Sequence, residues 1–404
     1  MKFKKMRLRM IKIKIDATTR LEIEKQHWNW YKNYLKKKQI PLKNNLPNGK
    51  KNVLSFLEHI LNWDYSLLKK IVLAHQSELH ALADKNCDIF KTYFQKKHLK
   101  IDIKQEKKDA EKWTVEKILK DYFGYDDFEK SAFPINGKKW GAYEFTRKLN
   151  VDVCPYCGRQ YIFTINDGDG RPQIDHYYPQ SDYPYLSCSL YNFIPSCPQC
   201  NHQKGDVLNK YATRTNMINH KEYKYDSDNR AFILYPYEDA FESEDENGTI
   251  KKFAWFSILY GEQKREYKSL DDSICVKIKK NKTLSNSKID NSIEAFHLNE
   301  LYSCHKIDIT DIFTRYRNYS NPKIDEITKL FIDERINTSD LRLNKNQRDA
   351  LYKKIAKTYT KRIKQTILGL PLDTKDKQYP LRKFKEDIIE QLDETAQKMR
   401  KEKT

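Results

Sequence analysis

Two Cys-x-x-Cys pairs, separated by 39 residues, constrain the fold of this chain more than any other feature of its sequence. Cys154 and Cys157 form the first pair, and Cys197 and Cys200 form the second. Two thiolates at this spacing can hold one tetrahedral ion across a tight turn, so two such pairs complete a four-cysteine zinc site. A redox role would need only one pair, placed between a strand and a helix. We therefore predict a structural zinc ion with no open coordination position for chemistry.

The sequence shows no segment typical of export or membrane insertion. No apolar run approaches the ~18 residues that span a bilayer, and Lys and Arg interrupt every apolar stretch near the N-terminus. We expect a cytoplasmic protein with no membrane partner, in a reducing compartment where paired cysteines favour metal over disulfide. The other four cysteines lack partners at ligand spacing and are expected to be ordinary buried thiols: Cys87, Cys188, Cys275 and Cys304.

The pattern of apolar residues predicts an α+β fold that is mainly α-helical. Glycine and proline, at 11 and 13 residues, are scarce, as is typical of long helices. Short alternating runs predict strands at 231–235, 253–260 and 273–279, and an acidic, solvated loop is expected at 238–246. Apolar residues recur at helical spacing in the N-terminal part, at Leu21, Trp28, Tyr31, Leu35, Leu67, Leu68, Ile71, Val72, Leu79 and Leu82.

The 404 residues are expected to form more than one domain. Residues 1–150 would form a helical region that opens with a basic edge strand at 3–15 and turns at 45–49. A cysteine-rich core at 151–212 would follow. After this core we expect a strand-containing insert at 213–295 and a helical C-terminal region at 296–404.

The charge of the chain is compatible with a nucleic-acid partner. There are 76 basic and 56 acidic residues, a net charge of +20, and such a field attracts polyanions. The same balance could reflect a general bias toward Lys, Asn, Ile and Tyr, so charge alone makes nucleic-acid binding plausible and no more. The Gly-x-x-x-x-Gly-Lys-Ser/Thr motif is absent, so this chain is not expected to hydrolyse ATP.

Between the two cysteine pairs lies a group of residues suited to phosphodiester hydrolysis. His176 is neutral near pH 7 and can take a proton from water. Asp175 and Asn201 offer a carboxylate and an amide oxygen, which are ligands that Mg²⁺ or Mn²⁺ prefers. Neighbouring residues of a strand face opposite sides, so Asp175 and His176 can take different roles.

This segment resembles the HNH (ββα-metal) endonuclease family, whose signature is Asp-His-x-x-Pro, a central Asn, and a His or Asn after the last zinc-knuckle cysteine. The resemblance covers about 53 of the 404 residues. It implies that His176 is the general base, that Asp175 and Asn201 hold the catalytic ion, and that Asn192 holds the loop carrying His176 through backbone hydrogen bonds. These four residues are the expected catalytic set.

The resemblance also implies a fold for the core. A β-hairpin is expected at about 160–177, with its loop at 167–170, where the Asp-Gly-Asp-Gly sequence suits a turn. A helix is expected to begin near Pro198. The ββα-metal core, with its four-cysteine zinc site, would be flanked by the helical N- and C-terminal regions.

The sequence departs from the commonest family pattern at Asn201, where many members have His. An all-oxygen site favours Mg²⁺ or Mn²⁺ over softer ions. His202 lies one residue later, about 100° around a helix, and is a poor substitute ligand. Lys204 follows on the same helix and could contact a phosphate, although a solvated lysine is an equal alternative.

The sequence thus predicts a metal-dependent endonuclease. DNA is preferred over RNA as substrate because the family mostly cuts DNA. A non-catalytic zinc-ribbon module that binds nucleic acid, or an RNA-directed nuclease, remains an alternative. HNH proteins with helical flanks are similar to nuclease subunits of bacterial anti-phage systems such as Septu and some retrons, which implies an ATPase partner subunit.

Overall fold

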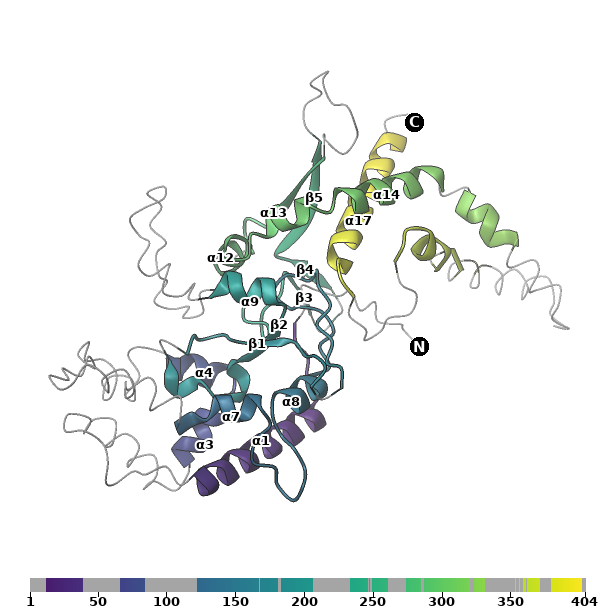
Figure 1. The fold of residues 1–404 in the computed structure, drawn as a ribbon. Coiled ribbons are helices and arrows are strands. Elements are labelled where there is room, and N and C mark those ends of the chain that lie inside the picture. The colour runs from purple at the N-terminus through teal and green to yellow at the C-terminus, as the bar shows by residue number, and fades with distance from the viewer. Residues whose placement is uncertain are drawn as a thin grey trace, which may run out of the picture. The chain divides into compact units, whose positions relative to one another are not determined.

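In the part of the chain that it describes, the computed structural model shows helices together with three small antiparallel sheets (Figure 1). It divides into two compact units. We call residues 9–241 with 286–296 the cysteine-rich unit, and 1–8, 242–285 and 297–404 the C-terminal unit. None of the described helices is both long and apolar enough to cross a membrane. The described residues are 12–38, 66–83, 122–166, 168–180, 183–205, 233–245, 249–260, 274–284, 287–319, 323–330, 362–370 and 379–401, with a few single residues.

Helix α1 (Ala17–Lys38) begins the described part of the cysteine-rich unit. The Asp16 carboxylate accepts hydrogen bonds from the backbone N–H and the hydroxyl of Thr19, at 2.9 and 2.6 Å, which caps the first turn. The buried side of α1 carries Ile23, His27, Trp30, Tyr31 and Tyr34. Leu21, expected on this side, is 68% exposed, because it lies two residues before Ile23 and therefore about 200° around the helix from it.

Among the described residues, four shorter helices of this unit precede the cysteine pairs: α3 (Ser66–Val72), α4 (Gln76–Ala83), α7 (Tyr125–Glu129) and α8 (Ala142–Leu149). The apolar positions predicted on α3 and α4 are buried: Leu68, Ile71, Val72, Leu79 and Leu82. Residues 12–16, the described end of the expected N-terminal strand, are not a strand. The rest of that strand and the turn at 45–49 lie outside the described residues.

The centre of the unit is a strand pair followed by a helix. Strand β1 (Gln173–His176) pairs antiparallel with β2 (Phe193–Ser196), with His176 opposite Phe193. Two short 3-10 turns, η2 (Pro184–Leu186) and η3 (Leu190–Asn192), lie between them. Helix α9 (Pro198–Lys204) follows β2 and contacts β1.

The hairpin expected at 160–177 is wrong, because β1 pairs with 193–196 instead. Residues 160–166 contribute only an isolated bridge between Val153 and Tyr161. A turn is present at 168–170, where the Ile165 N–H bonds the Gly170 carbonyl at 2.9 Å and Gly168 has φ 95°, while Asp167 lies outside the described residues. Pro172, just before β1, has no N–H with which to extend a ladder toward this turn.

The C-terminal unit is built on two strand pairs. Strand β3 (Glu242–Glu244) pairs with β4 (Ile250–Lys252), and β5 (Ala254–Tyr260) pairs with β6 (Ile274–Lys280). The predicted strands at 253–260 and 273–279 are thus confirmed to within a residue, whereas 233–235 is not a strand. The acidic stretch is not wholly solvated, because Glu242 is 3% exposed and lies 3.2 Å from the Lys383 ammonium.

Helices α13 (Leu298–Ser303), α14 (Lys306–Asn318) and α17 (Arg382–Lys401) complete the described core of this unit. Two side chains of α17 bond the backbone of β5: Asp387 accepts from the Phe256 N–H at 2.9 Å, and Gln391 bonds both backbone groups of Ile258. They satisfy polar groups that an edge strand would otherwise expose. The core comprises Phe256, Ile258, Val276, Tyr302, Ile309, Ile312, Leu368, Leu381, Phe384, Ile388 and Ile389. Helix α12 (Ser287–Ala295) belongs to the cysteine-rich unit.

Candidate metal centre and catalytic site

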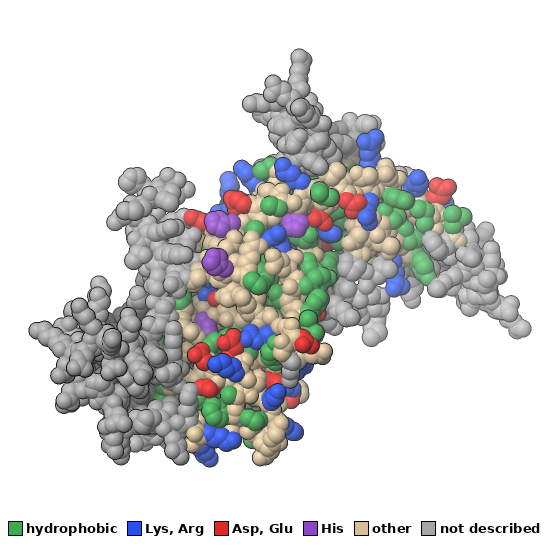
Figure 2. All heavy atoms as spheres, in the orientation of Figure 1, with side chains coloured by type: hydrophobic (Ala, Val, Ile, Leu, Met, Phe, Trp, Pro, Cys, Tyr) green, Lys and Arg blue, Asp and Glu red, His purple; other side chains and the backbone are tan. Residues whose placement is uncertain are grey.

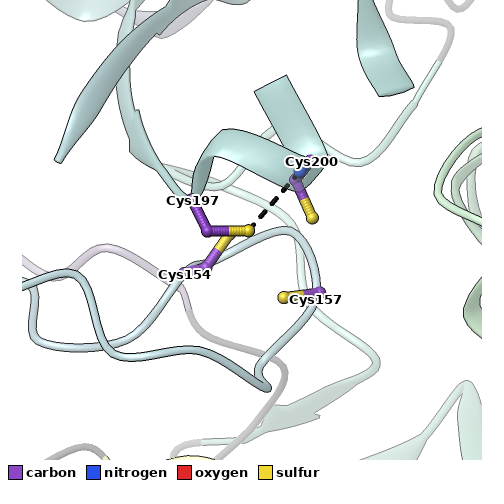
Figure 3. Close-up of side chains that lie close together, drawn as sticks. All are labelled: Cys154, Cys157, Cys197 and Cys200. Atoms are coloured by element: carbon purple, nitrogen blue, oxygen red, sulfur yellow. Dashed lines mark hydrogen bonds between the residues drawn. The ribbon is translucent and has the colours of Figure 1, made fainter. Parts of the chain in front are cut away.

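The two cysteine pairs come together in one buried cluster (Figure 3). The sulfur atoms of Cys154, Cys157, Cys197 and Cys200 all lie within 4.8 Å of one another. Cys197 caps α9, and its sulfur accepts a hydrogen bond from the Cys200 N–H at 3.4 Å. In the first pair, the Gly158 N–H bonds the Cys154 carbonyl at 2.8 Å, with Gly158 at φ 63°, which closes the turn. This arrangement is compatible with a zinc site.

The neighbouring sulfur atoms shift the pKa values of the cysteine thiols in the cluster in opposite directions. Hydrogen bonds from Cys154, Cys157 and Cys200 lower the pKa of Cys197 well below its usual range. Hydrogen bonds among the same sulfurs raise the pKa of Cys200, and burial raises the pKa of Cys154. A bound cation would stabilise all four groups as thiolates. The donor set of four soft sulfur atoms fits zinc, as the sequence predicted.

Asp175 occupies the side of β1 that faces α9, and its carboxylate contacts two neighbouring side chains. Only 5% of the residue is exposed. The Tyr156 hydroxyl donates to Oδ2 at 2.6 Å, and the Lys204 ammonium lies 3.1 Å from Oδ1 and 3.0 Å from Oδ2. Lys204 is 1% exposed and also donates to the His176 carbonyl oxygen at 2.6 Å. The alternative that Lys204 is a solvated lysine, which the sequence left open, is therefore wrong.

The His176 side chain lies among groups different from those around Asp175. Its ring meets Tyr125 edge-on, with centroids 4.4 Å apart, and its Nε2 lies 2.8 Å from the Ser187 carbonyl oxygen. A carbonyl can only accept, so this contact requires a proton on Nε2 and makes Nδ1 the nitrogen that can accept a proton. The Gln180 side-chain nitrogen lies 2.9 Å from the same Nε2. With a proton on Nε2, this amide must be turned so that its oxygen faces the ring.

Asn192 is fully buried and binds the loop between the two strands. Its Oδ1 accepts from the Tyr178 N–H at 2.7 Å, and its Nδ2 donates to the carbonyls of Tyr178 and Leu186 at 3.1 and 3.0 Å. The Tyr177 N–H bonds the Asn192 carbonyl at 2.9 Å. These are hydrogen bonds of the kind expected of Asn192, and they begin at the residue after His176.

Asn201 lies on α9, half-buried, and its Nδ2 donates to the Gln173 side-chain oxygen at 2.8 Å. Gln173 and Asp175 alternate along β1 and share one face, so Asn201 is on the Asp175 side of the strand. A divalent ion needs an accessible carboxylate oxygen. As arranged, both Asp175 oxygens contact the Lys204 ammonium and Oδ2 also accepts from Tyr156, so a second cation would meet the charge of the lysine. The expected Asp175–Asn201 ion site therefore does not fit a divalent ion without rearrangement.

Sequence reasoning missed Tyr156 and Ser187, which contact Asp175 and His176 respectively. The partner role of Lys204 left one trace in the sequence, because Asn201 and Lys204 are three residues apart and share a side of α9. For Tyr156 and Ser187 we find no such signal.

The cysteines outside the cluster differ from one another. Cys188 is buried as expected, and burial raises its pKa. Cys275 and Cys304 are exposed, so their predicted burial is wrong. Cys275 points outward from β6, opposite to its buried neighbour Val276, because side chains alternate along a strand. Cys87 lies outside the described residues.

The basic side chains are not gathered into one patch on the face that Figure 2 shows. Lys and Arg lie there among acidic and apolar side chains. Comparisons of the chain with family models, with curated proteins and with solved structures found no match. The cysteine cluster and the residues around Asp175 and His176 therefore carry the functional argument.

Proposed function

We propose that this chain is an HNH-type endonuclease that hydrolyses phosphodiester bonds of DNA, with His176 as its general base. The observation that carries this proposal is the oriented imidazole: the Nε2 proton of His176 is bound by the Ser187 carbonyl at 2.8 Å. A backbone carbonyl bonded to one ring nitrogen fixes the tautomer and places the basic lone pair on the other nitrogen, as a general base requires.

The surroundings of His176 support a rigid base. The loop after it is held by the three side-chain hydrogen bonds of Asn192, and the ring is packed edge-on against Tyr125 and Phe193. A general base acts efficiently only within hydrogen-bond reach of the proton that it removes, so a fixed ring orientation favours catalysis. The order strand, strand, helix is that of a ββα unit, with the second cysteine pair at the start of α9, although 173–176 pairs with 193–196 and not within 160–177.

The catalytic Mg²⁺ or Mn²⁺ that the resemblance implies stays a prediction. When bound, such an ion would neutralise charge on the scissile phosphate. Asp175 and Asn201 would hold it, but as arranged the Asp175 carboxylate contacts Tyr156 and Lys204. The preference for DNA, the ATPase partner subunit, and a place in cytoplasmic anti-phage defence also stay predictions from the resemblance.

A second candidate is a non-catalytic module that uses its zinc site to bind nucleic acid. The engagement of Asp175 favours it, because a buried carboxylate paired with Lys204 can be purely structural. An RNA-directed nuclease is the third candidate. A cleavage assay on supercoiled plasmid and on labelled RNA, each with Mg²⁺, Mn²⁺ or EDTA, distinguishes all three.

The test of the proposed base is His176→Ala. Cleavage should fall by about 10²–10⁴-fold, while zinc content and nucleic-acid binding stay as in the wild type, because no zinc ligand is changed. His202→Ala is the matched control. His202 is exposed on α9, so this variant should cut at the wild-type rate. A His176 variant that cuts as fast as the wild type would contradict the proposed mechanism.

A further inference from the structure

The Lys204 ammonium lies among oxygen atoms of the kind that also bind metal cations. The ammonium lies within 3.1 Å of both Asp175 oxygens and 2.6 Å from the His176 carbonyl oxygen. Carboxylate and carbonyl oxygens are also the ligands of hard divalent cations. The position that the sequence assigns to a metal ion is thus surrounded by the expected kind of oxygen atoms, and the chain supplies its own cation there.

Burial makes this pair strongly dependent on both partners. Lys204 is 1% exposed and Asp175 is 5% exposed. Lysine is almost never buried to this degree without a partner, and a buried charge that loses its partner is strongly destabilising. The Tyr156 hydroxyl satisfies one further lone pair of Oδ2. With Lys204 removed, Asp175 would retain a buried negative charge and a strong preference for another cation.

Lys204 and a divalent ion exclude each other at this carboxylate. Two cations on one carboxylate would lie within a few ångströms, where like charges in a buried site repel strongly. The lysine side chain is a flexible four-carbon stem, so its ammonium can leave without unwinding α9. Lys204 is also the last residue of α9, directly before Gly205.

We propose that Lys204 holds the cation position at Asp175 in the resting protein, and that a divalent ion binds Asp175 only after Lys204 is displaced. This inference rests on the proposed function in one respect, the choice of Asp175 as a metal ligand. It makes Lys204 a regulator of the site.

The test measures Mn²⁺ binding to the zinc-loaded full chain, from the electron paramagnetic resonance signal of free Mn²⁺, without nucleic acid. Lys204→Met keeps the length of the side chain and removes its charge. It should bind Mn²⁺ about tenfold tighter than the wild type, or more, because it frees the carboxylate. Lys204→Arg keeps the charge and should bind as weakly as the wild type. Adding Asp175→Asn to Lys204→Met should abolish the gain.

Two outcomes would overturn the proposal. One is equal Mn²⁺ affinity in the wild type and Lys204→Met, and the other is a gain that survives Asp175→Asn. No readout involves cleavage, so a failure here leaves the His176 proposal standing. Conversely, an uncleaved substrate would leave the Mn²⁺ result valid.

A second measurement covers the case in which Lys204→Met loses its zinc and unfolds. In the wild type, acetic anhydride should label the buried Lys204 amine slowly, as read by mass spectrometry. Saturating Mn²⁺ should speed this labelling, because the displaced ammonium becomes accessible. Labelling of exposed Lys138 should not change. Mn²⁺ that binds in an Asp175-dependent way without exposing Lys204 would overturn the proposal.

Discussion

Both units contain buried apolar side chains and polar contacts between distant segments, but among the described residues only the cysteine-rich unit contains a four-cysteine cluster. Tyrosine hydroxyls of the first unit donate to distant backbone carbonyls, as Tyr177 does to Ile233 and Tyr185 to Leu82, both at 2.6 Å. The second unit packs Phe256, Phe384 and their neighbours between two strands and three helices. The first unit should therefore be sensitive to metal loss and acid, and the second to cavities.

The largest expected effect is the loss of the cysteine cluster. Cys200→Ser should remove zinc and unfold residues 151–205, since structural zinc sites contribute about 10 kcal/mol or more to folding. Strand β5 and helix α17 should keep their amide protection, because their core contains no cysteine ligand. Zinc analysis and hydrogen exchange resolved by segment test both statements.

The control for this variant is Cys304→Ser, which changes an exposed thiol of the C-terminal unit and should leave zinc content unaltered. Full protection of 151–205 in zinc-free protein would show that the cluster does not stabilise the unit. Loss of protection in β5 as well would show that the two units fold together.

An intermediate effect is expected from a cavity in the C-terminal unit. Phe384 is fully buried, with its ring 5.2 Å from Tyr302 and 5.6 Å from Phe256. Phe384→Ala should lower the free energy of unfolding by about 3–5 kcal/mol. Leu330→Ala, at a residue 68% exposed, should change it by about 0.5 kcal/mol or less. Zinc content that falls in the Phe384 variant would contradict the contrast between the units.

The smallest effect is a pH dependence of the cysteine-rich unit. Burial lowers the pKa of His27 from 6.5 to about 4. Its Nε2 bonds the Cys188 carbonyl, and its Nδ1 accepts from Trp140 at 3.2 Å, so the neutral ring is required. The unfolded chain binds the proton more readily. The neutral His27 therefore contributes to the free energy of unfolding above pH 6.5. This contribution is lost as the pH falls toward 4, by about 2 kcal/mol at pH 5.

Unfolding monitored between pH 6.5 and 5, at constant zinc content, tests this dependence. His27→Gln should flatten the slope, whereas His202→Gln, at an exposed position, should not. An unchanged slope in the His27 variant would refute the assignment. In the C-terminal unit, Asp387 changes stability with pH in the opposite direction. Burial raises its pKa, so acidification removes the free-energy cost of burying the ionised carboxylate.

The local features of this protein could be predicted from its sequence. Cysteine pairs at ligand spacing, the strands near 253–260 and 273–279, and the buried faces of α3 and α4 all follow from neighbours within a few residues. Hydrophobic periodicity and turn chemistry are short-range properties, so they can be recognised in the sequence without knowledge of the fold.

The partners of those features were decided only by the tertiary structure. Strand β1 pairs with 193–196 and not with its sequence neighbours, and Glu242 is buried by Lys383 from α17. Asp175 and Lys204 were assigned to different roles by the sequence, yet they meet in one ion pair. The charge and exposure of a side chain depend on segments that pack against it from far along the chain, and no local pattern records them.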